Sequence, residues 1–417
     1  MGKSLINTMK ELADIWEKDE FVKYWSEFNK VPFAIYNEEQ VCIIGHDTLP
    51  DTFTCIDDYI YIGEITDDFK GNTAIDFHGK KIAIVGLHYM GNISIQRLYS
   101  IVLHESFHVF QSKGDMDYMC GDPLGILDYK FQVDNLFYRA LERSNLDNAV
   151  NSSEKKDLFL YLDQFIQYRN NRIKSLEEAA LHFEMGLETM EGTAAYLEIK
   201  ALMKCSGKDL NAVLKTYEGT MKFTDKTLKN FRGDCYITGA YMGLILDRLD
   251  KDWTEKYNKY EKSPYIYDFM IEVYNLYKEE ENNTRYDYSL NEDSELRGFI
   301  VEEIDKQERR KEKLFEEFKN GHEIKVSIKH NMRLCGYDPM NIDEIGNEIL
   351  HKNFICVDID GEKHCIFKPV IMEYENDRYN ISKITLKVDK EPEDEDGFYI
   401  IEGLGKFAAD MVEIIKR

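Results

Sequence analysis

His104, Glu105 and His108 are the residues whose types and spacing point most directly to chemistry. In a helix, residues four apart lie on one face, so both imidazoles can bind one ion. Glu105, next to the first imidazole, can then reach a water on that ion. Two imidazoles and an oxygen ligand suit zinc, which leaves one position for water and lowers the pKa of that water toward about 7. The pattern predicts a zinc site in which Glu105 acts as the general base.

The residues around this motif are almost all apolar: Val102, Leu103, Phe107, Val109 and Phe110. A helix that is apolar on all sides is a buried one. Burying two imidazoles and a carboxylate is costly unless they have a partner. The alternative, a surface helix whose histidines face water, would be expected to have polar neighbours. The context therefore favours a metal site inside the protein.

A zinc site of this kind needs a third protein ligand. A helix predicted to start at Ser175, with Glu178 completing a capping box, and to stop near Gly207 has acidic residues at spacings of four, three and seven. These residues are Glu184, Glu188, Glu191 and Glu198. They fall on one stripe of the helix, so the periodicity alone leaves the choice open.

The segment from Met190 to Glu198 reads Met-Glu-Gly-Thr-Ala-Ala-Tyr-Leu-Glu. It resembles the glutamate helix of the gluzincin metallopeptidases, especially the Glu-Gly-x-Ala-x-Tyr-x-Glu pattern of the zinc aminopeptidase-like branch. The resemblance implies that Glu191 is the third ligand, with Glu188 as the next candidate and a solvated glutamate as the alternative. Gly192, which has no side chain, would let the two helices approach closely around the ion.

The segment from Phe231 to Leu249 resembles the later Tyr-x-x-Gly-Ala helix of the same families. In those families the tyrosine donates a hydrogen bond to the oxyanion of the tetrahedral intermediate. The resemblance gives this role to Tyr236, with Tyr241 as the second candidate. The alternative is that a tyrosine at the start of an apolar helix only packs.

The resemblance covers roughly residues 80 to 250 and departs from the known pattern in three ways. His108 and Glu191 are far apart in the chain, so a helical insertion near residues 114–174 must be looped out. Ala195 stands where thermolysin-like members have an aspartate that orients the first histidine, so the orientation of the histidines must come from elsewhere, and Glu188 and Glu198 are the candidates to supply it. No Gly-x-Met-Glu-Asn element is present, so aminopeptidase activity is not implied.

In gluzincins an edge strand before the HExxH helix aligns an extended peptide by adding it to the sheet. Lys81 to Gly86, upstream of His104, is placed to be that edge. The equally weighted alternative is an ordinary core strand.

The hydropathy pattern predicts an α+β protein. Residues 1–92 should contain an N-terminal helix and a small antiparallel sheet with runs at 33–36, 41–44, 59–62 and 81–85. Residues 93–320 should form a mainly helical, zincin-like catalytic body, with helices over 95–110, 175–206 and 236–249, a solvated loop at 279–283 and a charged helix at 302–318. Residues 321–417 should form a smaller β-rich domain, in which Asp360-Gly361 marks a hairpin.

Composition narrows the classes of partner. The chain has 417 residues, with 78 Asp and Glu against 53 Lys and Arg, a formal net charge of −25. Such an acidic chain does not bind a nucleic acid or an anionic membrane unaided. No signal peptide and no apolar run of roughly 18 residues is present. We expect a cytoplasmic protein whose partner is a peptide or protein substrate. Its oligomeric state is not indicated.

The eight cysteines include no CxxC pair, and several have apolar neighbours. We interpret them as buried thiols in a reducing compartment, with disulfides as the minority alternative.

The sequence therefore predicts a zinc metallopeptidase with one Zn²⁺ per chain. One alternative is a non-catalytic zinc-binding protein whose C-terminal domain binds a partner. Glu105 argues against it, because a structural site needs no base. A third reading is a hydrolase of another amide or ester.

Overall fold

The computed structural model describes residues 4–113, 122–217, 221–224, 226–280, 293–401 and 404–416. Helices and strands are both abundant, so the α+β class is confirmed. The chain divides into two compact units. The first contains the described residues of Met1–Gly121 and Asp134–Glu292, and the second contains those of Asp122–Val133 and Asp293–Arg417.

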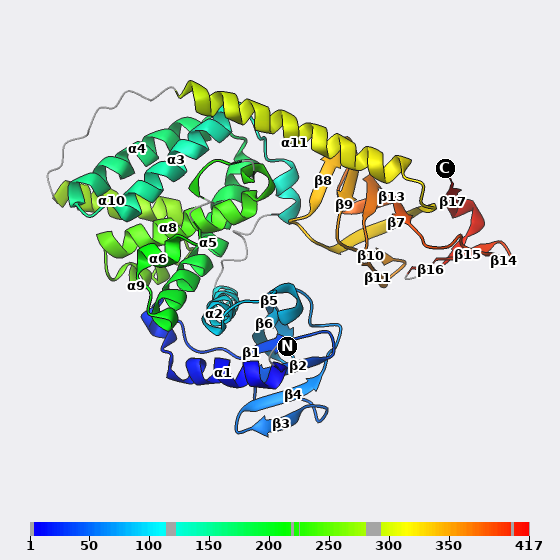
Figure 1. Cartoon of the computed structure of the whole chain (residues 1–417), viewed down its shortest axis with the longest axis horizontal. Coiled ribbons are helices and arrows are strands. Elements are labelled where there is room, and N and C mark those ends of the chain that lie inside the picture. Colours follow the sequence, from blue (N-terminus) through cyan, green and yellow to red (C-terminus); the bar gives the residue numbers. More distant parts are fainter. Residues whose placement is uncertain are drawn as a thin grey trace. The chain divides into compact units, whose positions relative to one another are not determined.

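The elements of the first unit are shown in blue to yellow-green in Figure 1. They are α1 (Leu5–Lys18), η1 (Phe21–Lys23), β1 (Phe33–Tyr36), β2 (Gln40–Ile44), β3 (Thr54–Asp57), β4 (Ile60–Glu64), β5 (Thr73–Phe77), β6 (Lys80–Gly86), η2 (Leu87–Tyr89), α2 (Ile95–Gln111), α3 (Val133–Asn151), α4 (Lys155–Ile173), α5 (Glu178–Ser206), α6 (Leu210–Leu214), η5 (Thr227–Lys229), α8 (Phe231–Leu249), α9 (Trp253–Asn258) and α10 (Ile266–Glu280).

The sheet of the first unit has the strand order β3-β4-β2-β1-β6-β5. Its pairs are antiparallel except β1 with β6, which run parallel, so the predicted antiparallel sheet is a mixed one. Strand β6 lies between β1 and β5. The reading of Lys81 to Gly86 as the free edge is therefore wrong, because β5 covers it, and the equally weighted alternative of a core strand is confirmed. The hairpin from β5 to β6 turns at His78 and Gly79, both with positive φ, as the two-residue turn requires.

Helix α2 has partners on two sides. Val102 and Val109 pack in the cluster formed with the sheet and α1. Leu103 and Phe107 belong to the larger cluster that includes α5 and α8. Figure 1 shows α2 beside β5 and β6, in agreement with its contacts. This double burial explains why the sequence of the helix is apolar nearly all round.

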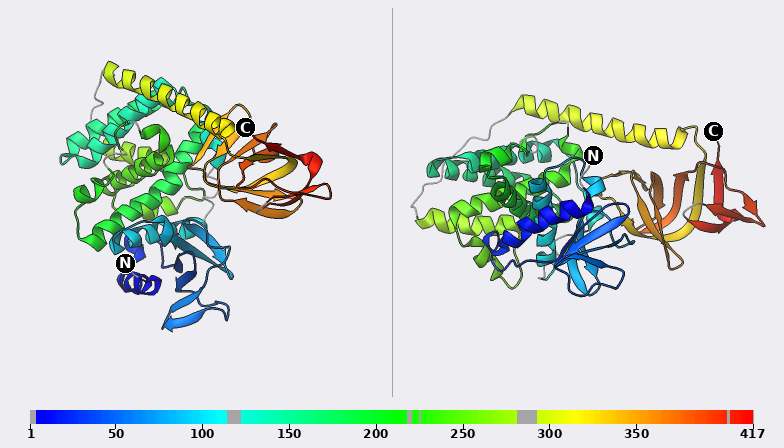
Figure 2. Two further views of the ribbon diagram at one scale, coloured as in Figure 1. Left: turned by 45° about the vertical axis from the view of Figure 1, so that its right-hand side comes forward. Right: turned by 60° about the horizontal axis from the view of Figure 1, so that its bottom comes forward.

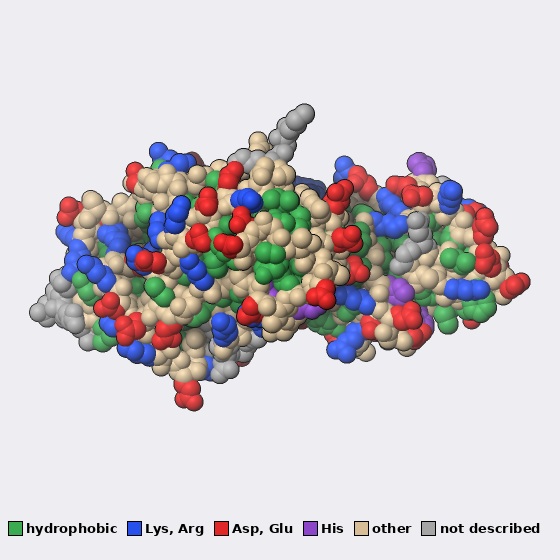
Figure 3. Space-filling model, turned by 90° about the horizontal axis from the view of Figure 1, so that it is seen from below, with side chains coloured by type: hydrophobic (Ala, Val, Ile, Leu, Met, Phe, Trp, Pro, Cys, Tyr) green, Lys and Arg blue, Asp and Glu red, His purple; other side chains and the backbone are tan. Residues whose placement is uncertain are grey.

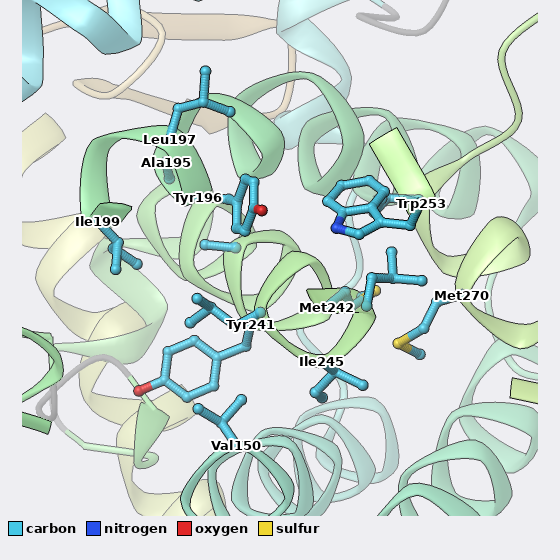
Figure 4. Packing of buried hydrophobic residues seen from close by; sticks show 14 of the residues in the cluster. Val150, Ala195, Tyr196, Leu197, Ile199, Tyr241, Met242, Ile245, Trp253 and Met270 are labelled. Carbon is cyan, nitrogen blue, oxygen red and sulfur yellow. The ribbon is translucent and has the colours of Figure 1, made fainter. Parts of the chain in front are cut away.

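Helices α5 and α8 cross at two glycines. A Cβ on Gly192 would lie 2.5 Å from Cα of Gly239, and one on Gly239 would lie 1.9 Å from the carbonyl oxygen of Glu188. The close approach predicted at Gly192 is therefore present, but its partner is α8 and not the HExxH helix. Tyr196 and Trp253 pack against each other in the hydrophobic core shown in Figure 4, with ring centroids 5.5 Å apart.

Helix α5 begins later than the sequence predicts. Glu177 is its N-cap residue and makes no side-chain capping hydrogen bond, so the predicted capping box from Ser175 is wrong. The Ser175 hydroxyl instead donates to the carbonyl of Arg172, because only a short link separates α4 from α5. The predicted stop is correct. Gly207 has φ +67°, the left-handed conformation that glycine adopts easily at a helix end.

A buried network of charged side chains joins α3, α4, α5 and α8. Every member is exposed by 3% or less. The members are Arg139, Glu142 and Arg143 on α3, Arg169 and Arg172 on α4, Glu184 and Glu188 on α5, and Asp234 on α8. Helices α3 and α4 also contribute to the main hydrophobic cluster. The insertion predicted near 114–174 is thus helical where it is described, but α3 and α4 belong to the core and are not looped out.

The elements of the second unit are shown in Figure 2, mostly in yellow to red. They are η4 (Pro123–Leu127), α11 (Ser294–Asn320), β7 (Lys325–Tyr337), β8 (Ile342–Ile345), β9 (Glu348–His351), β10 (Ile355–Ile359), β11 (Glu362–Ile366), β12 (Val370–Tyr374), β13 (Asn380–Lys387), β14 (Asp394–Glu395), β15 (Phe398–Ile401), β16 (Gly405–Ala408), η6 (Ala409–Met411) and β17 (Val412–Ile415).

The larger sheet of this unit has the order β11-β10-β7-β13-β12-β9-β8, and β17 also pairs with β7. Phe315 and Phe318 of α11 pack on Leu350 and Ile371 of the sheet. Helix α11 therefore belongs to the second unit, whose longer segment begins at Asp293, whereas the sequence predicted a boundary near residue 320. The predicted solvated loop lies mostly outside the described residues, because 281–292 are not described and Tyr277 to Glu280 belong to α10.

The hairpin at Asp360-Gly361 is confirmed. Both residues have positive φ and connect β10 to β11. Cys356 and Cys365 lie opposite each other in this hairpin and form a disulfide, with their Cα atoms 4.1 Å apart. The reading of all eight cysteines as buried thiols is therefore wrong, since directly paired residues of adjacent strands are close enough to bond. The cysteine argument for a reducing compartment no longer holds.

The remaining thiols are divided between interior and surface. Cys42 and Cys235 are buried, while Cys55 and Cys335 are exposed. Cys120 lies outside the described residues. None of the described helices is long and apolar enough to cross a bilayer. On the face shown in Figure 3, acidic and basic side chains are interspersed, so the net charge is not gathered in one patch there.

His351 is expected to make the stability of the second unit sensitive to acid. Its side chain is fully buried, and within the described part of the chain neither ring nitrogen has a hydrogen-bond partner. Burial lowers the pKa of His351 to about 4, although the charge of Asp338 acts in the opposite direction. The unfolded chain, with a pKa near 6.5, therefore binds more protons between these two values. Stability should be lost as the pH falls from about 6.5 toward 4.

We expect this loss to be about 2 kcal/mol for the second unit at pH 5, and about 3 kcal/mol once the pH falls below 4. Amide hydrogen exchange of β9 and β12 at pH 7.5 and pH 5 would measure it. His351→Leu, which keeps an apolar side chain at this site, should flatten the dependence. An equally steep dependence in His351→Leu would assign the acid sensitivity to another group.

Candidate metal centre

His104, His108 and Glu191 converge on one point, as the sequence predicted. Nε2 of His104 is 3.4 Å from Oε2 of Glu191, and Nε2 of His108 is 3.2 Å from the same oxygen. One donor atom from each residue lies within 4.8 Å of the other two. Helix α2 supplies both imidazoles from one face, and the adjacent α5 supplies the carboxylate.

This centre attracts positive charge. Burial disfavours the charged imidazolium of His104, but contacts with Glu191 and Glu198 outweigh this and raise its pKa to about 10. Burial would raise the pKa of Glu191, but His108 and His104 lower it well below its usual value. The carboxylates thus favour a cation between the imidazoles, and two imidazoles with one carboxylate are a donor set that zinc accepts. The residues fit a zinc ion.

Glu105 is 8% exposed and follows His104 directly in α2. Burial raises its pKa, while the imidazoles of His104 and His108 act in the opposite direction. A raised pKa makes a carboxylate a better proton acceptor near neutral pH. Glu105 is thus close enough to both imidazoles and to Glu191 and Glu198 to interact with them electrostatically.

Glu198 supplies the second contact of His104. Its Oε2 lies 3.2 Å from Nδ1 of His104, within ion-pair range although not aligned as a full hydrogen bond. Arg97 and Tyr217 hold the other oxygen, and the Tyr217 hydroxyl donates over 2.6 Å. Burial would raise the pKa of Glu198, but His104 and Arg97 lower it to about 2. Of the two orienting candidates, the structure selects Glu198.

Glu188 has a different role. Both of its oxygens accept hydrogen bonds from Arg169, at 2.6 and 2.7 Å, inside the buried network. Glu184 is paired in the same way with Arg172. The prediction of Glu188 as an orienting residue or substitute ligand is therefore wrong. The stripe of four glutamates on α5 splits, because its N-terminal half faces α3 and α4 and its C-terminal half faces α2.

His108 is oriented by a residue that the sequence analysis missed. Its Nδ1 lies 2.7 Å from Oε1 of Gln111, whose Nε2 donates to the carbonyl of Met190 and the hydroxyl of Thr193, both at 2.9 Å. Gln111 thereby links α2 to α5 by hydrogen bonds. Because it occupies Nδ1 of His108, Nε2 of that ring faces the point where His104 and Glu191 meet. The sequence feature that could have identified Gln111 is its position one turn after His108, at the end of an apolar helix.

Tyr236 lies at the centre. Its ring stacks on that of His104, with centroids 6.1 Å apart and planes at 25°. Arg232, one turn earlier on α8, has Nη2 3.5 Å from the Tyr236 hydroxyl and 3.5 Å from Oε1 of Glu191. Tyr241, the second candidate, is 1% exposed in the hydrophobic core, where Figure 4 shows it beside Val150. It is not part of the site.

No family model, no curated protein and no solved structure matches this chain.

Replacing Glu198 by glutamine should weaken zinc binding by about 10- to 100-fold, because His104 loses a charged partner that orients its ring. Zinc affinity measured against a competing chelator would show the change. Glu178→Gln, on the exposed first turn of the same helix, is the matched control and should bind zinc as the wild type does. Unchanged affinity in Glu198→Gln would mean that Glu198 does not orient the ligand.

Proposed function

We propose that this protein is a zinc-dependent peptidase of the gluzincin type. The observation that supports the proposal is the meeting of His104, His108 and Glu191 at one point beside Glu105. These three side chains would hold one zinc ion, which when bound activates water and polarises a carbonyl. The buried carboxylate of Glu105 is the proton acceptor that this chemistry needs, and a purely structural site needs none.

Each residue of the site has its own role in the proposed reaction. Glu105 accepts a proton from the water that attacks the scissile carbonyl, and donates it to the nitrogen of the leaving amine. Tyr236, stacked on His104, donates a hydrogen bond to the oxyanion. Glu198 and Gln111 contact Nδ1 of His104 and of His108 and so fix the orientation of the two imidazole rings. The substrate is a peptide or an unfolded protein segment.

An extended substrate has an available sheet edge. Strand β5 is the outer strand of the first sheet next to β6, and it contacts α2, which carries the HExxH motif. A peptide that pairs with β5 would continue the sheet by main-chain hydrogen bonds. In this proposal the substrate pairs with β5, whereas the sequence predicted pairing with the strand at Lys81 to Gly86.

Elemental analysis of the wild type, His104→Ala and Glu105→Gln tests the proposal. We expect about one zinc per chain in the wild type and in Glu105→Gln, and none in His104→Ala. The wild type should then cleave members of a peptide library, His104→Ala should not, and Glu105→Gln should cleave them far more slowly. A wild type that takes up no zinc when supplied with it would refute the site. Zinc without cleavage of any peptide would favour the non-catalytic alternative.

A further inference from the structure

We propose that Arg232 binds a carboxylate of the substrate beside the scissile bond. The inference rests on the proposed peptidase function and names the class of peptide that the site would accept. Arg232 lies on the first turn of α8, and its side chain is 14% exposed. The guanidinium is within 3.5 Å of both Glu191 and Tyr236, so it belongs to the same space as the metal centre.

The hydrogen-bonding capacity of this guanidinium is mostly unused. Both of its contacts come from Nη2, and both are 3.5 Å long, at the limit for a hydrogen bond. Among the described residues, Nη1 and Nε have no protein partner. Arg97 differs, because its Nη1 closely contacts Glu198 and the Tyr217 hydroxyl. The close contacts of Arg97 anchor it to Glu198 and Tyr217, whereas the two long contacts of Arg232 hold it weakly, so its guanidinium can turn its donors to a ligand.

The charge around Arg232 favours an anionic ligand. Glu191, its nearest carboxylate, directs its other oxygen to the two imidazoles. A cation held there would neutralise much of the negative charge of Glu191 and leave the guanidinium without a full counter-charge. A guanidinium presents its N–H groups in a planar fork that matches a carboxylate in two parallel hydrogen bonds. A substrate carboxylate would supply both the missing charge and the missing acceptors.

The position of Arg232 restricts which carboxylate it can bind. The Tyr236 hydroxyl, which the proposed mechanism directs to the oxyanion, is 3.5 Å away. The carboxylate must therefore belong to a residue next to the cleaved bond. It is either the C-terminal carboxylate of a peptide cleaved near its end, or the side chain of Asp or Glu flanking the bond. We infer that the substrates are peptides of this class.

Binding of matched peptides to zinc-loaded Glu105→Gln tests the inference without relying on turnover. One pair differs only in a free C-terminal carboxylate against its amide, and a second pair differs only in an internal Asp against Asn. Fluorescence anisotropy of dye-labelled peptides gives the dissociation constants. We expect a preference of about 10- to 100-fold for the carboxylate member of one pair, which also identifies the source of the carboxylate.

The same measurement on Glu105→Gln/Arg232→Gln should show this preference abolished, with binding of the neutral member unchanged. Arg232→Lys should retain part of it, since lysine keeps the charge but not the fork. Zinc stoichiometry and the thermal melting curve establish that the variants are folded. Equal weakening of both members would overturn the inference, because Arg232 would then only position Glu191 and Tyr236. An absent preference in Glu105→Gln, or no binding of either pair, would also overturn it.

Hydrolysis by the wild type separates the two proposals. Cleavage of both members of each pair at equal rates and with equal affinities would refute the carboxylate preference and leave the peptidase function standing. A carboxylate preference in binding that depends on Arg232, without cleavage of any peptide, would refute the peptidase function and leave the anion site.

Discussion

Replacing Arg172 by methionine should destabilise the first unit by roughly 3–5 kcal/mol. The guanidinium is fully buried and donates to both oxygens of Glu142 and both oxygens of Glu184, over 2.5 to 3.0 Å. Its removal deprives two buried carboxylates of one of their counter-charges, although Arg169 remains beside Glu142 and Arg139 beside Glu184. Burial would raise the pKa of Glu184, and Arg139 together with Arg172 now lowers it.

Urea unfolding followed by tryptophan fluorescence measures this loss selectively. The chain has three tryptophans, Trp16, Trp25 and Trp253, and all lie in the first unit. Arg172→Lys keeps the charge but cannot bind both carboxylates in the same fork, so its loss should be smaller. In Arg172→Met/Glu184→Gln one of the unpaired charges is gone, and part of the stability should return. A loss below about 1 kcal/mol in Arg172→Met would contradict a tightly coupled network.

Replacing Glu105 by glutamine should lower kcat/KM for a cleavable peptide by about 10²- to 10⁴-fold. Glutamine has nearly the same shape but cannot accept the proton of the attacking water. Because Glu105 is not one of the three residues that meet at the metal centre, zinc content should remain that of the wild type.

Steady-state kinetics and elemental analysis of the same preparations measure both quantities. Glu178→Gln provides an isosteric control on an exposed surface and should leave the kinetics unchanged. A Glu105→Gln variant that keeps full activity would remove the general base from the mechanism. Loss of zinc together with activity would instead make Glu105 a residue needed for metal binding.

Much of the local structure could be predicted from short-range pattern. The predicted helix at 95–110 is observed at Ile95–Gln111, and the first predicted strand at 33–36 has the observed bounds. Periodicity reports which face of an element is apolar, and that is a property of neighbouring residues. The turn at Asp360-Gly361 could be predicted because Asp-Gly accepts the positive φ that a two-residue hairpin turn requires. The prediction of a capping box at Ser175 was wrong because the serine hydroxyl donates its hydrogen bond to a carbonyl in the last turn of α4.

The sequence by itself determined the chemistry of the candidate site. His104, Glu105 and His108 lie on one helix, so their spacing already defines which side chains share a face. Their convergence with Glu191 followed from a resemblance between short segments, and the structure brings the three donors together.

Only the tertiary structure decided how that site is supported. Glu184, Glu188, Glu191 and Glu198 are equivalent by helical period, and they separate only because α3 and α4 bring arginines to two of them while α2 brings histidine to the others. Likewise, which strand forms the edge of the sheet and which donors of Arg232 remain unused depend on the neighbouring strands and side chains in the folded protein. Spacing along one element determines which side chains point the same way, whereas the partner of each side chain depends on packing between elements that are distant in the sequence.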